Sequence, residues 1–226
     1  MNKRTLLVLF AIVLAVNIAG VLLKVQWLEY TSKPLIIISL AAYFLLQVKR
    51  IMSGLRKWIL LALLFSWLGD MLLLFQENDP FFFLLGLSAF LAAHIFYIIF
   101  FHWVRVKEQI KSNIWLLLLV VAYYAALISF LSPYLGDMKL PVRVYGLVIS
   151  FMFMLAMHMF FIKDRRAGRM MMSGALLFVI SDSVLAINKF YQPFTLADPF
   201  IMLTYGLAQL FITEGAARYM NMSSKK

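Results

Sequence analysis

The chain has 226 residues, of which 64% are hydrophobic and 14% are charged. A water-soluble domain of this length cannot bury so many apolar side chains, so the composition favours one integral membrane domain over residues 1–226. Cysteine is absent, which excludes a disulfide framework, a thiolate nucleophile and a cysteine-ligated metal site. The formal net charge of +11 lies in short clusters between apolar runs, a pattern that favours anionic lipid headgroups over nucleic acid as partners.

Apolar runs of membrane-spanning length follow one another along the chain. An α-helix needs roughly 20 apolar residues to cross the hydrocarbon layer, so each run predicts a transmembrane helix. The sequence therefore predicts an all-α, polytopic transmembrane helical bundle. Its eight predicted spans lie near residues 5–23, 34–48, 58–75, 81–101, 113–131, 141–161, 170–188 and 199–217.

The first two runs need separate comment. The first follows Lys3 and Arg4, as the apolar segment of a signal peptide does. Its apolar run is longer than a typical signal, so we expect a retained span, while its removal would leave seven spans. The second run is the shortest, and Pro34 at its start suits the first turn of a helix.

Two aspartates within the third and seventh runs are the main functional signal. Each ionised group placed in lipid costs at least about 2.5–3.5 kcal/mol, so a carboxylate in a span indicates a function. Asp70 and Asp182 each precede the outer end of their run by about five to eight residues. The two carboxylates are therefore expected at a similar depth, facing one cavity. The alternative is that each aspartate only hydrogen-bonds neighbouring helices.

Weak internal similarity predicts a parallel 4+4 repeat of four-helix halves. The similar segments are 63–65 and 176–178, which precede the two aspartates, and 92–94 and 207–209 in the following runs. Such a repeat would bring a set of polar residues to one interface between the halves. These residues are Asp70, His94, Asp182, Tyr205 and Gln209. A purely structural role suits His94 equally well.

Lys and Arg residues are unequally divided between the two sides of the predicted bundle. Sixteen of the 21 lie on the side of the two termini, and the other five are Lys24, Lys33, Lys139, Arg143 and Lys189. The positive-inside rule then places both termini in the cytoplasm, with the cell membrane as the expected location. Glu214, near the inner end of the last run, is expected to reach the interface or to pair with Arg218 one turn on.

Familiar catalytic motifs are absent from the sequence. No His-x-x-x-His or His-Glu-x-x-His pattern occurs, so no metal site is predicted. No Gly-x-Ser-x-Gly elbow, Walker loop or dinucleotide loop occurs either. Acid–base chemistry by carboxylates, without a cofactor, is what the residues offer.

Short motifs in a fixed order resemble those of a known family. They are Lys33-Pro34, Gly69-Asp70, Ala93-His94 with Tyr97, Gly174 through Asp182, and Tyr205 through Gln209. Over nearly its whole length the chain resembles the YhhN-like lysoplasmalogenases, and it keeps their eight-span layout. The resemblance implies a hydrolase that cleaves the vinyl ether of lysoplasmalogens to a fatty aldehyde and glycerophospho-ethanolamine or -choline. The implied partner is a lysophospholipid in the bilayer, and the oligomeric state stays open.

Two carboxyl groups suit this chemistry. Protonation of the enol carbon gives an oxocarbenium ion that captures water, and the resulting hemiacetal collapses to the aldehyde. One carboxyl group must be neutral to act as the acid, a form that burial favours. The other should stay ionised, stabilise the cation and take a proton from water, as in glycoside hydrolysis. Asp182 is preferred as the acid, although the sequence fits either assignment.

Supporting roles and rival functions follow from the same residues. His94 could relay protons or bind the headgroup, Tyr205 and Gln209 could position water, and Lys33 could pair with the substrate phosphate. Tyr97 belongs to the same set of substrate-binding or supporting residues. The lipid chain would lie in a groove lined by Phe and Met. The main rival is a transporter in which the paired aspartates bind a proton or cation, and a lipid-binding scaffold is a third hypothesis.

Overall fold

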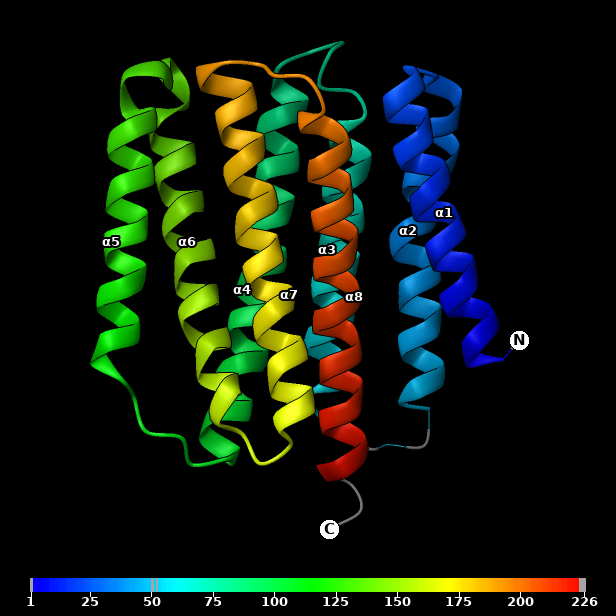
Figure 1. Ribbon diagram of the computed structural model, residues 1–226, viewed down its shortest axis with the longest axis vertical. Helices are drawn as coiled ribbons and strands as arrows, with labels where there is room; N and C mark the ends of the chain where they lie inside the picture. The colour runs from blue at the N-terminus through cyan, green and yellow to red at the C-terminus, as the bar shows by residue number, and fades with distance from the viewer. Residues whose placement is uncertain (1, 50, 52, 224–226) are drawn as a thin grey trace.

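The computed structural model describes residues 2–49, 51 and 53–223 of the chain, and these residues form helices and short connections without a strand. The predicted all-α class is confirmed. Eight long helices each run antiparallel to the one before (Figure 1). They are α1 (Lys3–Leu23), α2 (Gln26–Gln47), α3 (Arg56–Leu73), α4 (Phe81–Lys107), α5 (Ile114–Leu131), α6 (Lys139–His158), α7 (Arg165–Ala186) and α8 (Ala197–Ser223).

Short irregular helical segments extend some of these helices. Three are 3₁₀ turns, at Ser132–Tyr134, Gly136–Met138 and Met159–Phe161. The fourth, Ile187–Tyr191, is a π-helical turn that continues α7 beyond Asp182. Single π turns are uncommon and often occur near functional sites.

The start of α2 differs from the sequence prediction. The helix begins at Gln26, so Lys33 and Pro34 lie inside it, and the placement of Pro34 in a first turn was wrong. The additional polar turns are held against α1 by a buried hydrogen bond from Asn17 Nδ2 to Ser32 Oγ, 2.9 Å long. A buried polar pair of this kind lets a helix extend beyond the apolar run that a hydropathy pattern detects.

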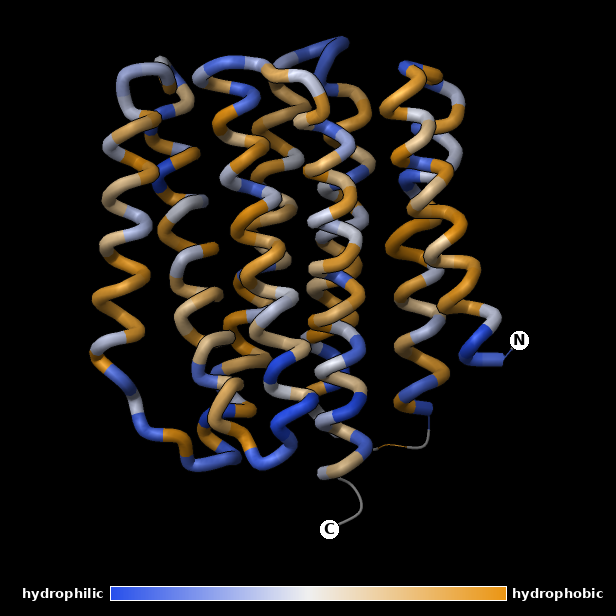
Figure 2. The backbone as a smooth tube through the Cα atoms, viewed as in Figure 1, coloured by the Kyte–Doolittle hydropathy of each residue, from blue (hydrophilic) through white to orange (hydrophobic). Residues whose placement is uncertain are grey.

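The chain is a multi-pass membrane protein. Six helical segments in the described part of the chain, all except α2 and α3, are long and apolar enough to cross a membrane. Hydrophobic residues fill the middle of the bundle, while hydrophilic residues gather toward its two ends (Figure 2). Within α5 the buried residues are Val120 and Leu131, so most of its apolar side chains face outward, as expected for a helix in lipid. The count of eight crossings, the single domain and the 4+4 repeat stay predictions.

Close packing between α7 and α8 forms the centre of the fold. At Gly174 of α7 an added Cβ would lie 2.8 Å from the carbonyl oxygen of Ala208, and at Gly215 of α8 it would lie 2.9 Å from that of Ala167. Only a residue without a side chain permits these approaches. The tight contact fixes Asp182 of α7 relative to Tyr205 and Gln209 of α8, because all three belong to this rigid pair.

The connections α2–α3, α4–α5 and α6–α7 lie at the same end of the bundle as the C-terminus (Figure 1). Most of the Lys and Arg residues counted in the sequence belong to this end; Arg50, Lys225 and Lys226 lie outside the described residues. Glu214 does not pair with Arg218. It accepts hydrogen bonds of 2.6 Å from Tyr43 and Gln47 of α2, while Arg218 pairs with Asp164 at 2.9 Å.

Candidate active site

Asp70 lies in the last turn of α3, near the end of the bundle opposite the termini, and its side chain is buried. The Tyr205 hydroxyl of α8 donates a 2.7 Å hydrogen bond to Asp70 Oδ2. The ring of Phe90 packs edge-on against Tyr205, with centroids 5.7 Å apart. Gly69 makes room for this ring, since a Cβ there would lie 2.6 Å from Phe90. The glycine before the aspartate therefore allows an aromatic wall to close over the carboxylate.

Asp182 belongs to a second polar group, built from α4, α6 and α7. Tyr145 Oη donates a short hydrogen bond to Asp182 Oδ2. His94 Nε2 lies 2.9 Å from Tyr145 Oη and 3.4 Å from Asp182 Oδ2. Since Tyr145 donates its proton to the carboxylate, it accepts from His94, which places a proton on Nε2. The group is an acid–base chain in which histidine, phenol and carboxylate are joined.

The exposures within this second group differ. His94 is fully buried, whereas the Asp182 side chain is 15% exposed and is the accessible end of the group. His94 Nδ1 is buried and makes no hydrogen bond within the described residues. A buried ring nitrogen without a partner is uncommon, because most buried polar atoms in proteins are hydrogen-bonded.

A third group lies one helical turn from Asp70. Tyr97 Oη of α4 donates to Gln209 Oε1 at 2.6 Å, and Gln209 Nε2 donates to Ser66 Oγ of α3 at 2.9 Å. All three side chains are buried. These two hydrogen bonds connect Tyr97, Gln209 and Ser66, and they therefore hold α4, α8 and α3 together next to Asp70.

The ring of Phe178 stands between the two aspartate groups. Its centroid lies 4.7 Å from that of His94 and 5.5 Å from that of Tyr205. No hydrogen bond or ion pair within the described part of the chain joins Asp70 directly to Asp182. The two aspartate groups are therefore neighbours that pack against the same aromatic ring.

Lys33 of α2 is partly buried, and its positive charge acts on both Asp70 and Glu29. It is thus the cation associated with the Asp70 group. Two residues of the site were missed by sequence reasoning, Tyr145 and Phe178. A tyrosine or phenylalanine in an apolar run carries no charge signal, so only the packing reveals these positions.

Comparison with known proteins gives a consistent result. A model of the YhhN family matches residues 28–216. Human lysoplasmalogenase TMEM86B is 33% identical over 197 residues, which cover 86% of this chain and 78% of the relative. Human lysoplasmalogenase TMEM86A is 34% identical over 165 residues, covering 70% of this chain and 64% of the relative. Lysoplasmalogenase TMEM86B of Sus scrofa is 34% identical over 154 residues, covering 67% and 60%. No solved structure matches the chain.

Proposed function

Because this chain belongs to the YhhN family, we propose that it is a lysoplasmalogenase-like membrane hydrolase that uses Asp70 and Asp182 in catalysis. Its substrate is a lysoplasmalogen, and its products are a fatty aldehyde and a glycerophospho-base. The curated relatives named as lysoplasmalogenases support the reaction. The observation that carries the catalytic assignment is the contact of one partly accessible carboxyl group, Asp182, with both Tyr145 and His94.

The reaction begins with proton transfer to carbon. The carboxylic acid of Asp182 protonates the vinyl carbon that is not bonded to oxygen, and the electron pair of the double bond forms the new C–H bond. The ether oxygen then shares the positive charge as an oxocarbenium ion. Water adds to the cationic carbon and gives one proton to the Asp70 carboxylate. As the hemiacetal collapses to the aldehyde, Asp70 passes this proton to the departing glycerol oxygen, and the hemiacetal hydroxyl proton returns to Asp182, so both carboxyl groups are restored.

The geometry of the Asp182 group suits a proton donor. Tyr145 and His94 both contact Oδ2, so Oδ1 is the oxygen that carries the proton to the substrate. After transfer, Tyr145 stabilises the new carboxylate through its hydrogen bond. His94 donates its Nε2 proton in a hydrogen bond to Tyr145 and so holds the tyrosine in place against Asp182.

Asp70 supplies negative charge beside the developing cation. Burial alone favours the neutral carboxyl form, but the positive charge of Lys33 and the hydrogen bond from Tyr205 both favour the carboxylate of Asp70. Tyr205 fixes the orientation of its carboxyl group, and Lys33, whose charge acts on Asp70, binds the substrate phosphate. In this proposal Tyr97 and Gln209 hold the helices that carry the site.

The enzyme also has an expected orientation. We propose that both termini face the cytoplasm and that the site opens near the opposite side of the cell membrane, since Lys and Arg residues gather at the end with the termini. The transporter alternative draws no support from the relatives, which are named for hydrolysis.

The test uses protein purified in detergent, where no ion gradient exists. We expect aldehyde release from a lysoplasmalogen, and none from the matched lysolipid whose ether bond is saturated, because only the vinyl ether can form the oxocarbenium ion by protonation. Asp70→Asn and Asp182→Asn variants that keep the wild-type elution profile should both lose release. If both variants still release aldehyde, the two aspartates are not the catalytic residues. If the wild type binds the lysoplasmalogen but releases no aldehyde, this lipid is not the substrate.

A further inference from the structure

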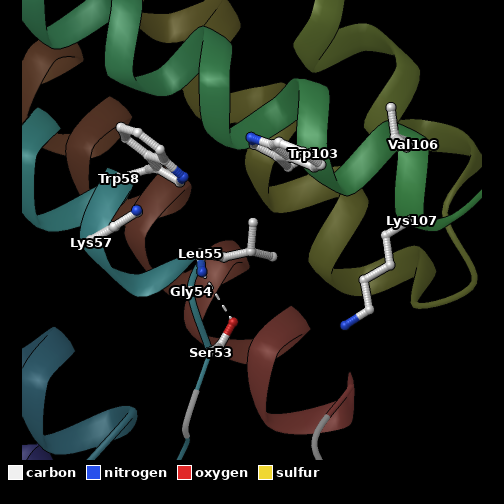
Figure 3. Close-up of a pocket in the computed structure, with 8 residues that line it drawn as sticks. All are labelled: Ser53, Gly54, Leu55, Lys57, Trp58, Trp103, Val106 and Lys107. Atoms are coloured by element: carbon white, nitrogen blue, oxygen red, sulfur yellow. Dashed lines mark hydrogen bonds between the residues drawn. The ribbon is translucent and has the colours of Figure 1, made fainter.

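A cavity lies at the end of the α3–α4 pair on the side of the two chain termini. It has a volume of about 610 Å³, and Figure 3 shows the side chains around it. Its walls are the first turn of α3 and the last turn of α4, whereas Asp70 lies at the other end of α3. The cavity is therefore separate from the candidate active site.

Aromatic side chains from both helices line this cavity. Trp58 of α3 and Trp103 of α4 both lie at its edge (Figure 3). Trp58 stacks on Phe96 with ring centroids 6.0 Å apart, which holds it in place. Trp103 is 53% exposed. Tryptophan at the end of a transmembrane helix is typical of the membrane–water interface, where lipid headgroups meet acyl chains.

The charge on the lining residues is positive only. Lys57 and Lys107 line the cavity, and none of its lining residues is acidic. Lys57 Nζ lies 4.6 Å from the centre of the Trp58 ring. Lys107 Nζ donates a 2.8 Å hydrogen bond to Ser223 Oγ, and an ammonium group has three donors, so two stay available. Two ammonium groups beside an apolar wall match an anion that carries apolar chains.

One of the lining residues, Gly54, has open space beside it. An added Cβ at this glycine would meet no atom within 4 Å. Ser53 next to it adds a hydroxyl group. Lys57 and Lys107 stand on opposite sides of the cavity (Figure 3), so an anionic headgroup placed over it would have an ammonium group on each side.

We propose that this cavity binds the headgroup of an anionic phospholipid from the leaflet on the side of the termini. The headgroup lies over the cavity, with Lys57 on one side and Lys107 on the other, and the acyl chains run along Trp103 and Val106 toward the bilayer interior. Such a lipid would join the ends of α3 and α4, the two helices that carry Asp70 and His94.

The experiment measures bound lipid by native mass spectrometry of protein offered equimolar phosphatidylglycerol and phosphatidylcholine in detergent. The wild type should retain phosphatidylglycerol in preference. Lys57→Gln combined with Lys107→Gln should reduce this retention by about tenfold, since each Lys near the surface contributes to anionic lipid binding. Lys111→Gln combined with Lys163→Gln removes the same charge from the same side, outside the cavity, and should not reduce it.

A steric variant separates this cavity from general surface charge. Gly54→Phe keeps every lysine and fills the open space beside Gly54, so it should also reduce retention of phosphatidylglycerol. Inorganic phosphate at millimolar concentration should not displace the lipid, because it lacks the apolar chains. The proposal would be overturned if the two double variants lost the lipid equally or if Gly54→Phe retained it fully. It would also be overturned if free phosphate displaced the lipid, or if the wild type did not prefer phosphatidylglycerol over phosphatidylcholine. Thermal unfolding of each variant in detergent checks that it is folded.

Discussion

His94 Nε2 lies 3.4 Å from Asp182 Oδ2, and the hydroxyl of Tyr145 contacts both residues. Three helices, α4, α6 and α7, thus meet at a single carboxylate oxygen. This arrangement gives Oδ2 two protein partners, while the Asp182 side chain as a whole is 15% exposed. The catalytic predictions below follow from it.

Asp182→Asn should reduce the rate of aldehyde release by about 10²- to 10⁴-fold, the range of general acid catalysis by one side chain. The amide has the shape of the carboxyl group but cannot donate a proton to carbon. Lysoplasmalogen binding, measured by isothermal titration in detergent, should change little. Asp137→Asn, an exposed residue on the same side of the bundle, is the matched control and should keep full activity.

Tyr145→Phe should lower kcat by about tenfold and leave KM nearly unchanged, because the lost hydroxyl positions Asp182 and His94 rather than the lipid. Tyr124→Phe offers a control, since its hydroxyl bonds the backbone oxygen of Arg143 at the exposed surface. If KM rises in Tyr145→Phe while kcat stays constant, the residue binds substrate and does not position the acid.

Tyr205→Phe should destabilise the protein by about 1–3 kcal/mol, because it removes the hydrogen bond to the buried carboxyl group of Asp70. The loss should appear as a lower unfolding temperature in detergent. Tyr30→Phe removes a comparable 3.1 Å hydrogen bond at an exposed position and should change stability by less than about 0.5 kcal/mol. Similar shifts in both variants would contradict a special role for the buried pair.

Gly174→Val should destabilise the α7–α8 pair by about 1–3 kcal/mol or more, since the new side chain meets backbone atoms of Ala208 and Ile212 at 2.8 Å. Gly54→Ala is the control, because nothing lies within 4 Å of its added Cβ. Thermal unfolding of both variants, compared with wild type, measures the difference. A stable Gly174→Val protein would show that the two helices can separate without cost.

The helices were predictable from sequence because each apolar run is bounded by polar connections, and this pattern is local. The start of α2 was not, because its polar turn is stabilised by Asn17 of another helix. The same limit applies to Glu214, whose nearest cation along its helix, Arg218, bonds Asp164 from α7's N-terminus instead. An ion-pair partner that depends on tertiary packing cannot be identified from the spacing of residues along one helix.

Within the site, Asp70 and Asp182 could be selected from sequence because an ionisable group in an apolar run is costly and therefore informative. Tyr145 and Phe178 carry no charge, so placing them in an apolar run costs little and does not mark them in the sequence. Their importance depends on which helices lie side by side, as the ring of Phe178 between His94 and Tyr205 illustrates.

The most direct test of the account is the reaction run in D₂O with detergent-purified wild-type protein, followed by mass spectrometry of the fatty aldehyde. Protonation of the vinyl carbon by an exchangeable acid predicts one deuterium on the carbon next to the aldehyde carbon. Authentic aldehyde kept in the same buffer corrects for exchange after release. Aldehyde without this deuterium would contradict carboxyl-catalysed protonation of the vinyl ether, and the roles proposed for Asp70 and Asp182 would fall with it.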